Sequence, residues 1–321
     1  MTLPDPTHTL TLVSVIIPTH AGASTLEASV HHLLRNDYPS FEVIVVDNGA
    51  TPETREAIAR LPKKVRVVRS EKNLGFPGGC NLGVAQAEGE IIALLNDDAE
   101  ARPDWLRELV GALMQNPDVG LVGSLILEPD GEHIQSAGCR FYSNYLNIHI
   151  AKGEPWFEAS TEPSERDSVM GAAVAIDKDL LQALGGLAES YFPGYYEDCE
   201  LCYRLRRLGY RILLVPSARV VHHEKQTIRE DEDYFRVYHR NRWQFILRNL
   251  PLGEIVEVCA AEIGWAVNIT RWRDFRHHNA LLYAYAWNFV RLPTTLSARR
   301  NLQRWDQQLE ESAEEQPGQS A

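Results

Sequence analysis

The chain has 321 residues, 44% of them hydrophobic, and a formal net charge of −12 at pH 7. This length and apolar content suffice for one large α/β domain with an appendage. The acidic balance excludes a general nucleic-acid binder as a class, because neutralising backbone phosphates needs a dense basic face. We therefore expect no nucleic-acid partner.

The terminus and the cysteines indicate the compartment. Residues 1–13 lack the basic and apolar regions of a secretory signal, and no run of about 20 apolar residues predicts a membrane span. The five cysteines are odd in number and scattered, which favours reduced thiols over a disulfide framework. We expect a cytoplasmic protein, and peripheral contact with the inner face of the cytoplasmic membrane stays open.

The first part of the chain alternates between two patterns. Apolar runs at 13–18, 42–46, 65–68 and 91–95 predict buried strands. Helical patterns lie between them at 26–34 and 51–61, and a glycine-rich turn at 73–81 leads into a helix that ends near 87. Such alternation predicts an α/β fold, with a mostly parallel sheet and helices on both faces.

The next part is less regular. We predict a helix at 103–115 and a strand at 119–127, then a mobile loop region at 128–167 that is rich in Gly, Pro, Tyr and acids. Small residues at 169–176, Gly171 and Ala172 among them, indicate close approach of backbone or ligand. A short helix at 177–184, a helix from 195 to Gly209, and two short strands at 211–215 and 218–221 follow.

Polar residues come directly after the predicted strands. The 91–95 strand ends in Asn96-Asp97-Asp98, and Thr19, Asp47 and Asn73 follow or closely follow the other three. The carboxyl ends of parallel strands form the ligand-binding edge of such a sheet. Neighbouring carboxylates there call for a compensating cation, and a hard divalent metal carrying a diphosphate is the leading candidate. An ordinary turn and helix cap before Pro103 explains residues 96–98 equally well.

The glycine-rich turn at 73–81 excludes two nucleotide-binding classes. It carries neither the dinucleotide fingerprint nor the lysine of a phosphate-binding loop. We therefore expect neither an NAD site nor a P-loop ATPase.

A second acidic pair, Glu197-Asp198, occupies the first turn of the predicted helix. Carboxylates at that position cap backbone N–H groups and interact favourably with the helix dipole, which is the simpler interpretation. The same position suits a general base, which must be deprotonated and fixed in direction. His222, at the end of a strand, is either a metal ligand or a solvent-facing side chain.

An ordered set of motifs resembles a known family. The motifs are SVIIPT (14–19), VVDN (45–48), NLGF (73–76) with Gly79 and Asn81, LNDD (95–98), MGA (170–172), Glu197-Asp198 through Arg204-Leu205 to Gly209-Tyr210, and Val221-His222. The set resembles the inverting family 2 glycosyltransferases, most closely the bacterial branch of rhamnosyl- and galactofuranosyltransferases. The resemblance covers 13–249, and the joint pattern is specific although each motif alone is weak.

The resemblance implies the GT-A fold and a role for each motif residue. Asp198 would be the catalytic base, and Asp98 of the DXD-type motif would hold Mg²⁺ or Mn²⁺ together with His222. Gly171, Ala172 and Glu197 would lie on the acceptor side. The nucleotide-sugar donor would contact Pro18, Thr19, Asp47, Asn73, Gly79, Asn96 and Asp97, with Asp47 holding the base of the nucleotide.

The sequence departs from the family pattern at three places. His20 stands where a small residue or Asn is usual, Ala188 replaces a frequent Asp, and a Ser often found shortly after the histidine is absent. These departures leave the donor sugar and acceptor contacts open. They do not affect the metal and base positions.

We divide the chain into a catalytic domain at 1–228, a helical region at 229–304, and an acidic, disordered tail at 305–321. The catalytic domain comprises a nucleotide-binding half at 13–127 and an acceptor half at 128–228. Residues 229–304 hold twelve Arg and eight Asp or Glu, with aromatic helices such as that of Tyr234 to Phe245. The helices either pack against the catalytic domain or a partner in a homo-oligomer, or contact an anionic membrane surface.

The function implied is metal-dependent inverting glycosyl transfer. The donor would be a nucleoside-diphosphate sugar of the dTDP-rhamnose or UDP-hexose type, and the acceptor a hydroxyl of a saccharide or lipid-linked molecule in cell-surface polysaccharide synthesis. A sugar-phosphate nucleotidyltransferase is the alternative, although the segment after Thr19 lacks a basic triphosphate loop. A non-catalytic sugar-nucleotide-binding protein is a second alternative, which the presence of all three residues Asp98, Asp198 and His222 disfavours.

Overall fold

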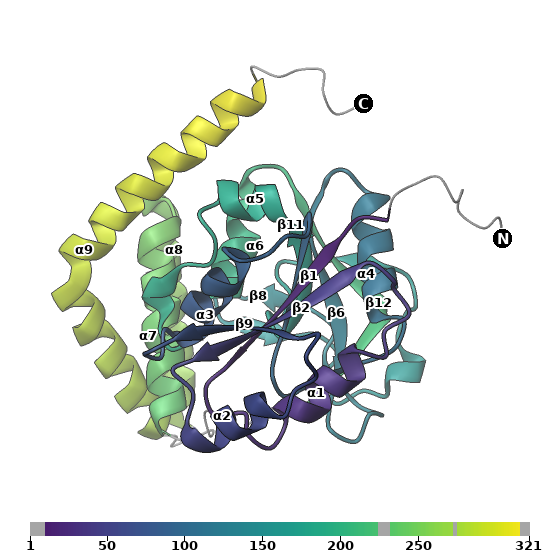
Figure 1. Ribbon diagram of the computed structural model, residues 1–321. Coiled ribbons are helices and arrows are strands. Elements are labelled where there is room, and N and C mark those ends of the chain that lie inside the picture. The colour runs from purple at the N-terminus through teal and green to yellow at the C-terminus, as the bar shows by residue number, and fades with distance from the viewer. Residues whose placement is uncertain (1–9, 224–231, 272–274, 315–321) are drawn as a thin grey trace.

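The computed structural model describes residues 10–223, 232–271 and 275–314. A twisted central sheet is flanked by helices, and three C-terminal helices lie along one side of the molecule (Figure 1). The sheet order is β10-β12-β6-β11-β4-β1-β2-β3, with β5 paired to β12 and β7 to β6. This arrangement confirms the predicted α/β class.

The half of the sheet formed by β1 to β4 is parallel, as expected. It comprises β1 (Val13–Thr19), β2 (Phe41–Asn48), β3 (Arg66–Ser70) and β4 (Ile91–Leu95). All residues of β1 and β4 are buried, because helices cover both faces of these strands. The register pairs Thr19 with Asp47, so both lie at the carboxyl edge of the sheet.

Two hydrophobic clusters separate the two faces of the sheet. One face packs against α1 (Leu26–Leu33), α2 (Pro52–Ala59) and α4 (Trp105–Met114), and the other against α3 (Gly75–Val84), α5 (Lys178–Ala183) and α6 (Glu197–Arg207). α3 begins at Gly75, so the expected glycine-rich turn is largely helical. A Cβ on Gly83 would lie 2.3 Å from Ile16 Cγ2, so the glycines let α3 approach the sheet closely.

The other half of the sheet is mixed. β11 (Ala173–Asp177) is antiparallel to both neighbours, β4 and β6 (Val119–Leu127). β12 (Arg211–His222) is one strand where we predicted two, since its pairing with β6 continues across a register shift between Val215 and Arg219. β5 (Ala99–Ala101) pairs with the end of β12.

The segment 128–167 is ordered, contrary to our expectation of a loop region. It contains β7 (Ile134–Ser136), β8 (Cys139–Phe141), β9 (Asn147–His149), a 3₁₀ turn at Trp156–Glu158 and β10 (Ser164–Glu165). β8 and β9 form a separate two-stranded sheet. These elements have two or three residues each, which is too short for an alternating pattern to be recognised in the sequence.

The C-terminal region consists of α7 (Glu232–Asn249), α8 (Leu252–Arg271) and α9 (Phe275–Glu314), with α9 packed along α7. The expected boundary at residue 228 lies outside the described residues. The tail predicted to start at Trp305 is helical up to Glu314, because Trp305 packs on Gly185 and Asp306 pairs with Arg204. Within the described parts of the chain, no helix is long and apolar enough to cross a bilayer.

Candidate active site

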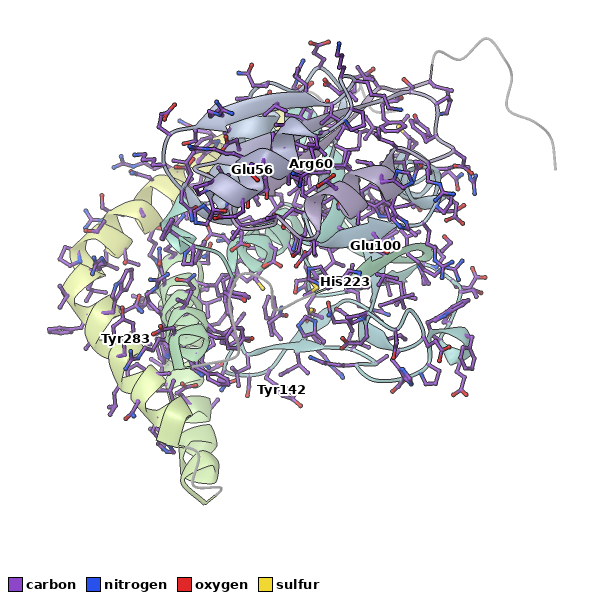
Figure 2. All side chains as sticks on the ribbon, turned by 60° about the horizontal axis from the view of Figure 1, so that its bottom comes forward. Glu56, Arg60, Glu100, Tyr142, His223 and Tyr283 are labelled. Atoms are coloured by element: carbon purple, nitrogen blue, oxygen red, sulfur yellow. The ribbon has the colours of Figure 1, made fainter. Side chains whose placement is uncertain are left out.

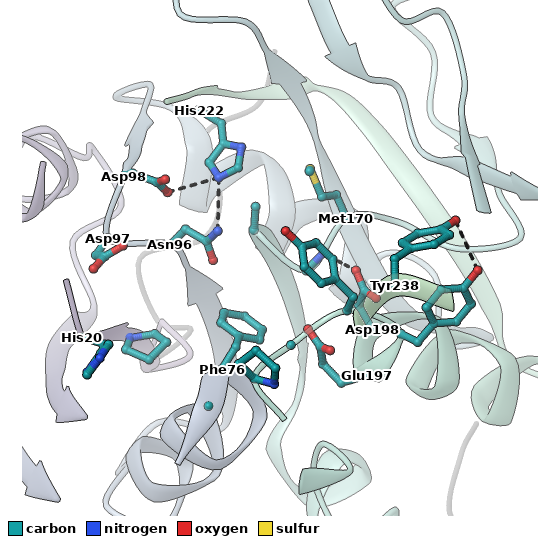
Figure 3. Close-up of a pocket in the computed structure, with 18 of the residues that line it drawn as sticks. His20, Phe76, Asn96, Asp97, Asp98, Met170, Glu197, Asp198, His222 and Tyr238 are labelled. Atoms are coloured by element: carbon teal, nitrogen blue, oxygen red, sulfur yellow. Dashed lines mark hydrogen bonds and ion pairs between the residues drawn. The ribbon is translucent and has the colours of Figure 1, made fainter. Parts of the chain in front are cut away.

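A cavity of about 480 Å³ opens at the carboxyl ends of β1 and β4 and at the first turn of α6. Figure 3 shows Asp97, Asp98 and His222 on one side of it and Glu197 and Asp198 on another. The lining comprises Pro18, Thr19, His20, Asn48, Asn73, Gly75, Phe76, Asn96, Asp97, Asp98, Asn147, His149, Met170, Gly171, Ala172, Pro193, Gly194, Tyr195, Tyr196, Glu197, Asp198, Cys199, His222, Tyr234 and Tyr238.

Strand pairing brings Asp98 and His222 together although they lie far apart in the sequence. β5 pairs with β12 so that His222 lies opposite Ala99, and His223 N donates to Asp98 O at 2.9 Å. Asp98 and His222 are 7% and 3% exposed, and the atoms Asp98 Oδ1 and His222 Nε2 are 3.1 Å apart. The sheet therefore fixes a carboxylate and an imidazole side by side at the cavity wall.

The donor set of this pair fits a divalent metal. Asp98 Oδ1 and Asn96 Oδ1 are buried and accept no hydrogen bond from any residue that the structure describes. Adjacent ligands of an octahedral ion with bonds of about 2.1 Å lie about 3.0 Å apart, close to the spacing of Asp98 Oδ1 and His222 Nε2. Among the described residues, no group of three His, Cys, Asp or Glu side chains could hold a metal. Phosphate oxygens and water commonly complete the coordination of such an ion.

Asp97 has a different environment from its neighbour Asp98. Thr19 Oγ1 donates to Asp97 Oδ2 at 2.5 Å. Burial raises the pKa of Asp97 to about 7, against the lowering effect of the Thr19 hydrogen bond, and the charge of Asp98 raises it further. A cation beside Asp98 would favour ionised Asp97.

Asp198 is held by two backbone amides. Gly171 N donates to Asp198 Oδ2 at 3.0 Å, and Cys199 N donates to Oδ1 at 2.7 Å. Burial raises the pKa of Asp198, while these two hydrogen bonds oppose the rise. The carboxylate thus has a fixed direction and an increased basicity, which are the properties of a general base.

Glu197, the other acid of the pair, is buried beside Asp198. Burial raises the pKa of Glu197 well above its ordinary value, and the neighbouring charge of Asp198 adds to the rise. Its Oε2 is buried and has no hydrogen-bond partner within the described chain. Of the two acids, Asp198 with its amide donors is therefore the one that ionises first.

Small residues connect the two sides of the cavity. Gly171 N reaches Asp198, and Ala172 O accepts from Asn96 N at 2.9 Å. A Cβ on Gly171 would lie 3.2 Å from Asp198 Cβ. The predicted close approach of backbone at 169–176 occurs here, between the acidic motif and the candidate base.

Amides and backbone groups form the end of the cavity at β1 and β2. Asn48 donates to Gly75 O at 2.9 Å, and Leu74 N donates to Asn48 Oδ1 at 2.9 Å. Asn73 Oδ1 accepts from Gly75 N at 2.8 Å. Pro18, Thr19 and Asn73 line this end, as does His20, whose Nδ1 is 2.9 Å from Gly49 O.

Asp47 and Gly79 do not line the cavity in this structure. Asp47 is fully buried, where it accepts from Ala50 N at 2.9 Å and from Arg69 Nε at 2.7 Å. Gly79 lies in α3, where a Cβ would be 3.0 Å from Pro18 Cβ and from Asn48 Nδ2. Neither residue is among those that line the cavity, and their roles toward a bound nucleotide stay predictions.

Aromatic side chains form one wall of the cavity. Tyr195 and Tyr196 have φ angles of 74° and 76°, which direct the chain into α6, and Asn241 of α7 donates to Tyr195 O at 3.0 Å. Tyr196 Oη donates to Tyr238 Oη at 3.2 Å. Tyr234 stacks on Tyr238 with ring centroids 6.0 Å apart.

Sequence reasoning did not identify several lining residues. Asn147 and His149 come from the segment taken for a loop, and Tyr234 and Tyr238 from a helix assigned to packing or membrane contact. Burial lowers the pKa of His149 to about 4. The only available signal was the concentration of aromatic residues at 234–245, because nothing in the sequence relates that segment to Asp198.

Comparisons with known proteins show the family to which this chain is related. Residues 14–157 match the family Glycosyl transferase family 2, and 91–305 match Glycosyl transferase family group 2. The chain is 31% identical over 246 residues, 70% of its length, to the O-antigen biosynthesis protein RfbC of Myxococcus xanthus. It is 27% identical over 259 residues, 73% of its length, to the N-acetylglucosaminyl-diphospho-decaprenol L-rhamnosyltransferase of Mycobacterium tuberculosis.

The relatives differ in how much of them the chain covers. It spans 84% of the mycobacterial protein but only 19% of the Myxococcus protein, and 24% of another relative that is 38% identical. Among solved structures, the mannosyltransferase PcManGT of Pyrobaculum calidifontis, in complex with GDP-Man and Mn²⁺, aligns with a TM-score of 0.58 at 19% identity. That alignment covers 89% of each chain. At this identity the likeness shows the fold alone, which is GT-A. The chain therefore belongs to the family 2 glycosyltransferases, in the rhamnosyltransferase-like branch.

Proposed function

We propose that this protein is a metal-dependent, inverting glycosyltransferase that moves a sugar from a nucleoside-diphosphate donor to a hydroxyl group. The observation that carries the proposal is the cavity itself. The pair Asp98 and His222 and the amide-held carboxylate of Asp198 line one space, as can be followed in Figure 3. A charge-neutralising site and a base are the two elements that a displacement at the anomeric carbon needs.

Asp198 would act as the base in a single displacement. The acceptor hydroxyl oxygen attacks the anomeric carbon and transfers its proton to Asp198, while the bond from that carbon to the diphosphate oxygen breaks. The nucleoside diphosphate leaves with the bonding electron pair. Attack opposite the leaving group inverts the anomeric configuration.

Asp98 and His222 would hold the metal, either Mg²⁺ or Mn²⁺. When bound, the ion would supply positive charge to the departing diphosphate. The PcManGT complex contains Mn²⁺, which supports a divalent ion without selecting between the two metals. The carboxylate oxygen of Asp98 suits both metals, whereas the imidazole of His222 is a poor ligand for Mg²⁺, a hard cation that prefers oxygen.

The names of relatives suggest the donor and acceptor classes. The mycobacterial relative is named a rhamnosyltransferase acting on a diphospho-decaprenol acceptor, and the Myxococcus relative an O-antigen biosynthesis protein. For this chain we propose a donor of the dTDP-rhamnose or UDP-hexose type, and a lipid-linked saccharide acceptor in polysaccharide synthesis. The tyrosine-rich wall at Tyr195, Tyr196, Tyr234 and Tyr238 would face the acceptor.

A lipid-linked acceptor would require contact with a membrane surface, and α8 and α9 would supply it. Leu252, Val256 and Ile263 of α8 and Leu282, Phe289 and Val290 of α9 are each at least 67% exposed. Figure 2 shows Tyr283 on this flank of the molecule. Residues 278–304 contain four arginines and no Asp or Glu, a balance that favours anionic headgroups.

Flotation with vesicles tests the membrane contact. Wild-type protein should float with phosphatidylglycerol vesicles more than with phosphatidylcholine vesicles, and Phe289→Ser with Val290→Ser should reduce this binding. Met114→Ser, which changes an exposed apolar residue on α4, is the matched control. If the wild type does not float and its molecular mass rises with protein concentration, the apolar surface belongs to a homo-oligomer interface instead.

Thermal shift with a panel of sugar nucleotides tests the central proposal. We expect one nucleoside diphosphate and its sugar to raise the melting temperature in the presence of Mn²⁺. The shift should be smaller without metal and smaller again in Asp98→Asn. Stabilisation that is the same in the wild type and Asp98→Asn would contradict the metal assignment.

A further inference from the structure

A buried glutamine lies directly behind the candidate metal ligand His222. Gln135 is in β7, which pairs with β6, and its side chain is 2% exposed. It does not line the cavity and touches the reacting groups only through His222. A buried amide has strict hydrogen-bonding requirements, so its contacts constrain its orientation.

The surroundings of Gln135 determine which way its amide points. On one side Nε2 donates, over long hydrogen bonds, to Glu128 Oε2 at 3.4 Å and to His222 O at 3.5 Å. Both of these partners are acceptors. The reversed amide would place its own oxygen against them, so Oε1 must point the other way, toward His222 Nδ1 at 2.7 Å.

This orientation sets the tautomer of His222. Because Gln135 Oε1 only accepts, Nδ1 of the imidazole must carry the hydrogen. In the neutral ring, Nε2 then presents a lone pair toward Asp98 Oδ1 at 3.1 Å, an atom that is itself rich in electrons. Asn96 Nδ2, also 3.1 Å from Nε2, is a donor and agrees with this assignment.

We infer that Gln135 is a positioning residue for the metal site. Through its acceptor at Nδ1 it holds His222 in the tautomer and ring orientation in which Nε2 can bind a divalent cation together with Asp98. Residues that hydrogen-bond to the second ring nitrogen of a metal-ligating histidine commonly fix its tautomer and orientation and thereby raise metal affinity. The inference rests on the proposed function, because it gives His222 the role of a metal ligand.

Glu128, which accepts from Gln135, belongs to the same β6–β7 hairpin as Gln135. Glu128 follows β6, and its backbone N–H donates to His133 O at 2.8 Å, which closes the β6–β7 connection. Gln135 therefore links His222 to the β6–β7 hairpin. A conformational change of that hairpin would alter the orientation of His222.

The tautomer is tested first, in the metal-free protein. Two-bond ¹H–¹⁵N correlation spectra of the histidine rings distinguish Nδ1–H from Nε2–H, and comparison with His222→Asn identifies the signal of His222. We expect Nδ1–H in the wild type and its loss in Gln135→Met, where the acceptor is missing. A wild-type His222 with the hydrogen on Nε2 would overturn the inference.

Metal affinity is tested second, by electron paramagnetic resonance with Mn²⁺ alone and with Mn²⁺ plus UDP or dTDP. Gln135→Met should weaken Mn²⁺ binding about 10–100-fold. The exchange Gln135→Glu with Glu128→Gln keeps an acceptor at Nδ1 and a donor beside it, so it should restore most of the affinity. His133→Ala, on the exposed side of the same hairpin, should bind as the wild type does.

The outcomes separate this inference from the proposed function. If the wild type binds no Mn²⁺ under any of these conditions, the metal role of Asp98 and His222 fails, and the tautomer spectra still test Gln135. If the wild type binds Mn²⁺ and Gln135→Met binds it equally well, Gln135 has no positioning role. If Gln135→Met does not fold, the exchanged pair and the wild-type spectra decide between these results.

Discussion

Arg204 and Asp306 form a buried ion pair that joins the acid-bearing helix α6 to the end of α9. Arg204 Nη2 is 2.9 Å from Asp306 Oδ1, and the two side chains are 6% and 10% exposed. Arg204 also donates to Leu184 O at 2.7 Å. The position of α6, with Asp198 in its first turn, is therefore coupled to the last described turns of the chain.

We expect Asp306→Ala to destabilise the protein by about 3–5 kcal/mol, because it leaves the Arg204 guanidinium buried without its counter-charge. Urea unfolding followed by circular dichroism measures the change. Asp118→Ala, which removes the exposed partner of Arg211, is the matched control and should leave the unfolding midpoint nearly unchanged. Equal effects of the two variants would show that the burial of the Arg204–Asp306 pair is energetically unimportant.

Asp198→Asn should lower kcat about 10²–10⁴-fold while donor affinity stays close to that of the wild type. The amide keeps the shape of the side chain but cannot remove the acceptor proton. Radiolabelled sugar transfer measures turnover, and isothermal titration calorimetry measures donor binding. Glu53→Gln, on the exposed first turn of α2, is the control. Normal turnover in Asp198→Asn would rule out Asp198 as the base.

Glu197→Gln should have a small effect, within about threefold in kcat, because burial and the charge of Asp198 raise the pKa of Glu197 well above its ordinary value, which favours the neutral acid. Glutamine imitates the protonated acid in size and charge. The same transfer assay measures it beside Asp198→Asn. A loss as large as that of Asp198→Asn would mean that Glu197 acts in the reaction as a carboxylate.

In the metal-free protein, Asp97 should make folding less stable as the pH rises from about 4 to about 7, while His149, whose pKa is lowered from 6.5 to about 4, acts in the opposite direction. Asp97 has a folded-state pKa of about 7, above its ordinary value of 3.8, so the folded state binds more protons than the unfolded state within this window. Each such group contributes a slope of at most about 1.4 kcal/mol per pH unit. Urea unfolding at several pH values measures the slope.

Asp97→Asn and added Mn²⁺ provide the controls for this pH effect. The variant removes the titrating group and should make the slope less negative than in the wild type, while the raised pKa values of Glu197 and Asp198 and the lowered pKa of His149 account for the slope that remains. A cation beside Asp98 lowers the pKa of Asp97 and should also flatten it. An unchanged slope in Asp97→Asn would mean that the pKa of Asp97 is not raised by folding.

Much of the half of the sheet formed by β1 to β4, with its helices, was predictable from the sequence, because the sequence signals of these elements are local. The wholly apolar strand β4 ends where the polar residues 96–98 begin. Thr51-Pro52 starts α2, and the Thr51 side chain accepts a hydrogen bond from Thr54 N. The ordered motifs also identified the family, which the comparisons confirmed. Strand and helix periodicities of about 2 and 3.6 residues are properties of consecutive residues, so they can be read without a structure.

The segment 128–167 could not be read in this way. Its strands are two or three residues long, and β10 pairs with β12, a strand distant in the sequence. The same holds for α9 beyond Trp305, where the acidic composition indicated disorder. The partner of Asp306 is Arg204, 102 residues away, and composition carries no information about that contact.

The sequence by itself determined the α/β class, the family and the acids and histidine that belong to its motifs. Only the tertiary structure decided how they meet: β5 pairs with β12 and brings His222 to Asp98, and Gly171 reaches Asp198 across the cavity. It also separated Asp47 and Gly79 from the cavity and placed Gln135 behind His222. The physical reason is that hydrogen bonds between strands and the burial of side chains depend on neighbours in space, whereas a sequence pattern records only neighbours along the chain.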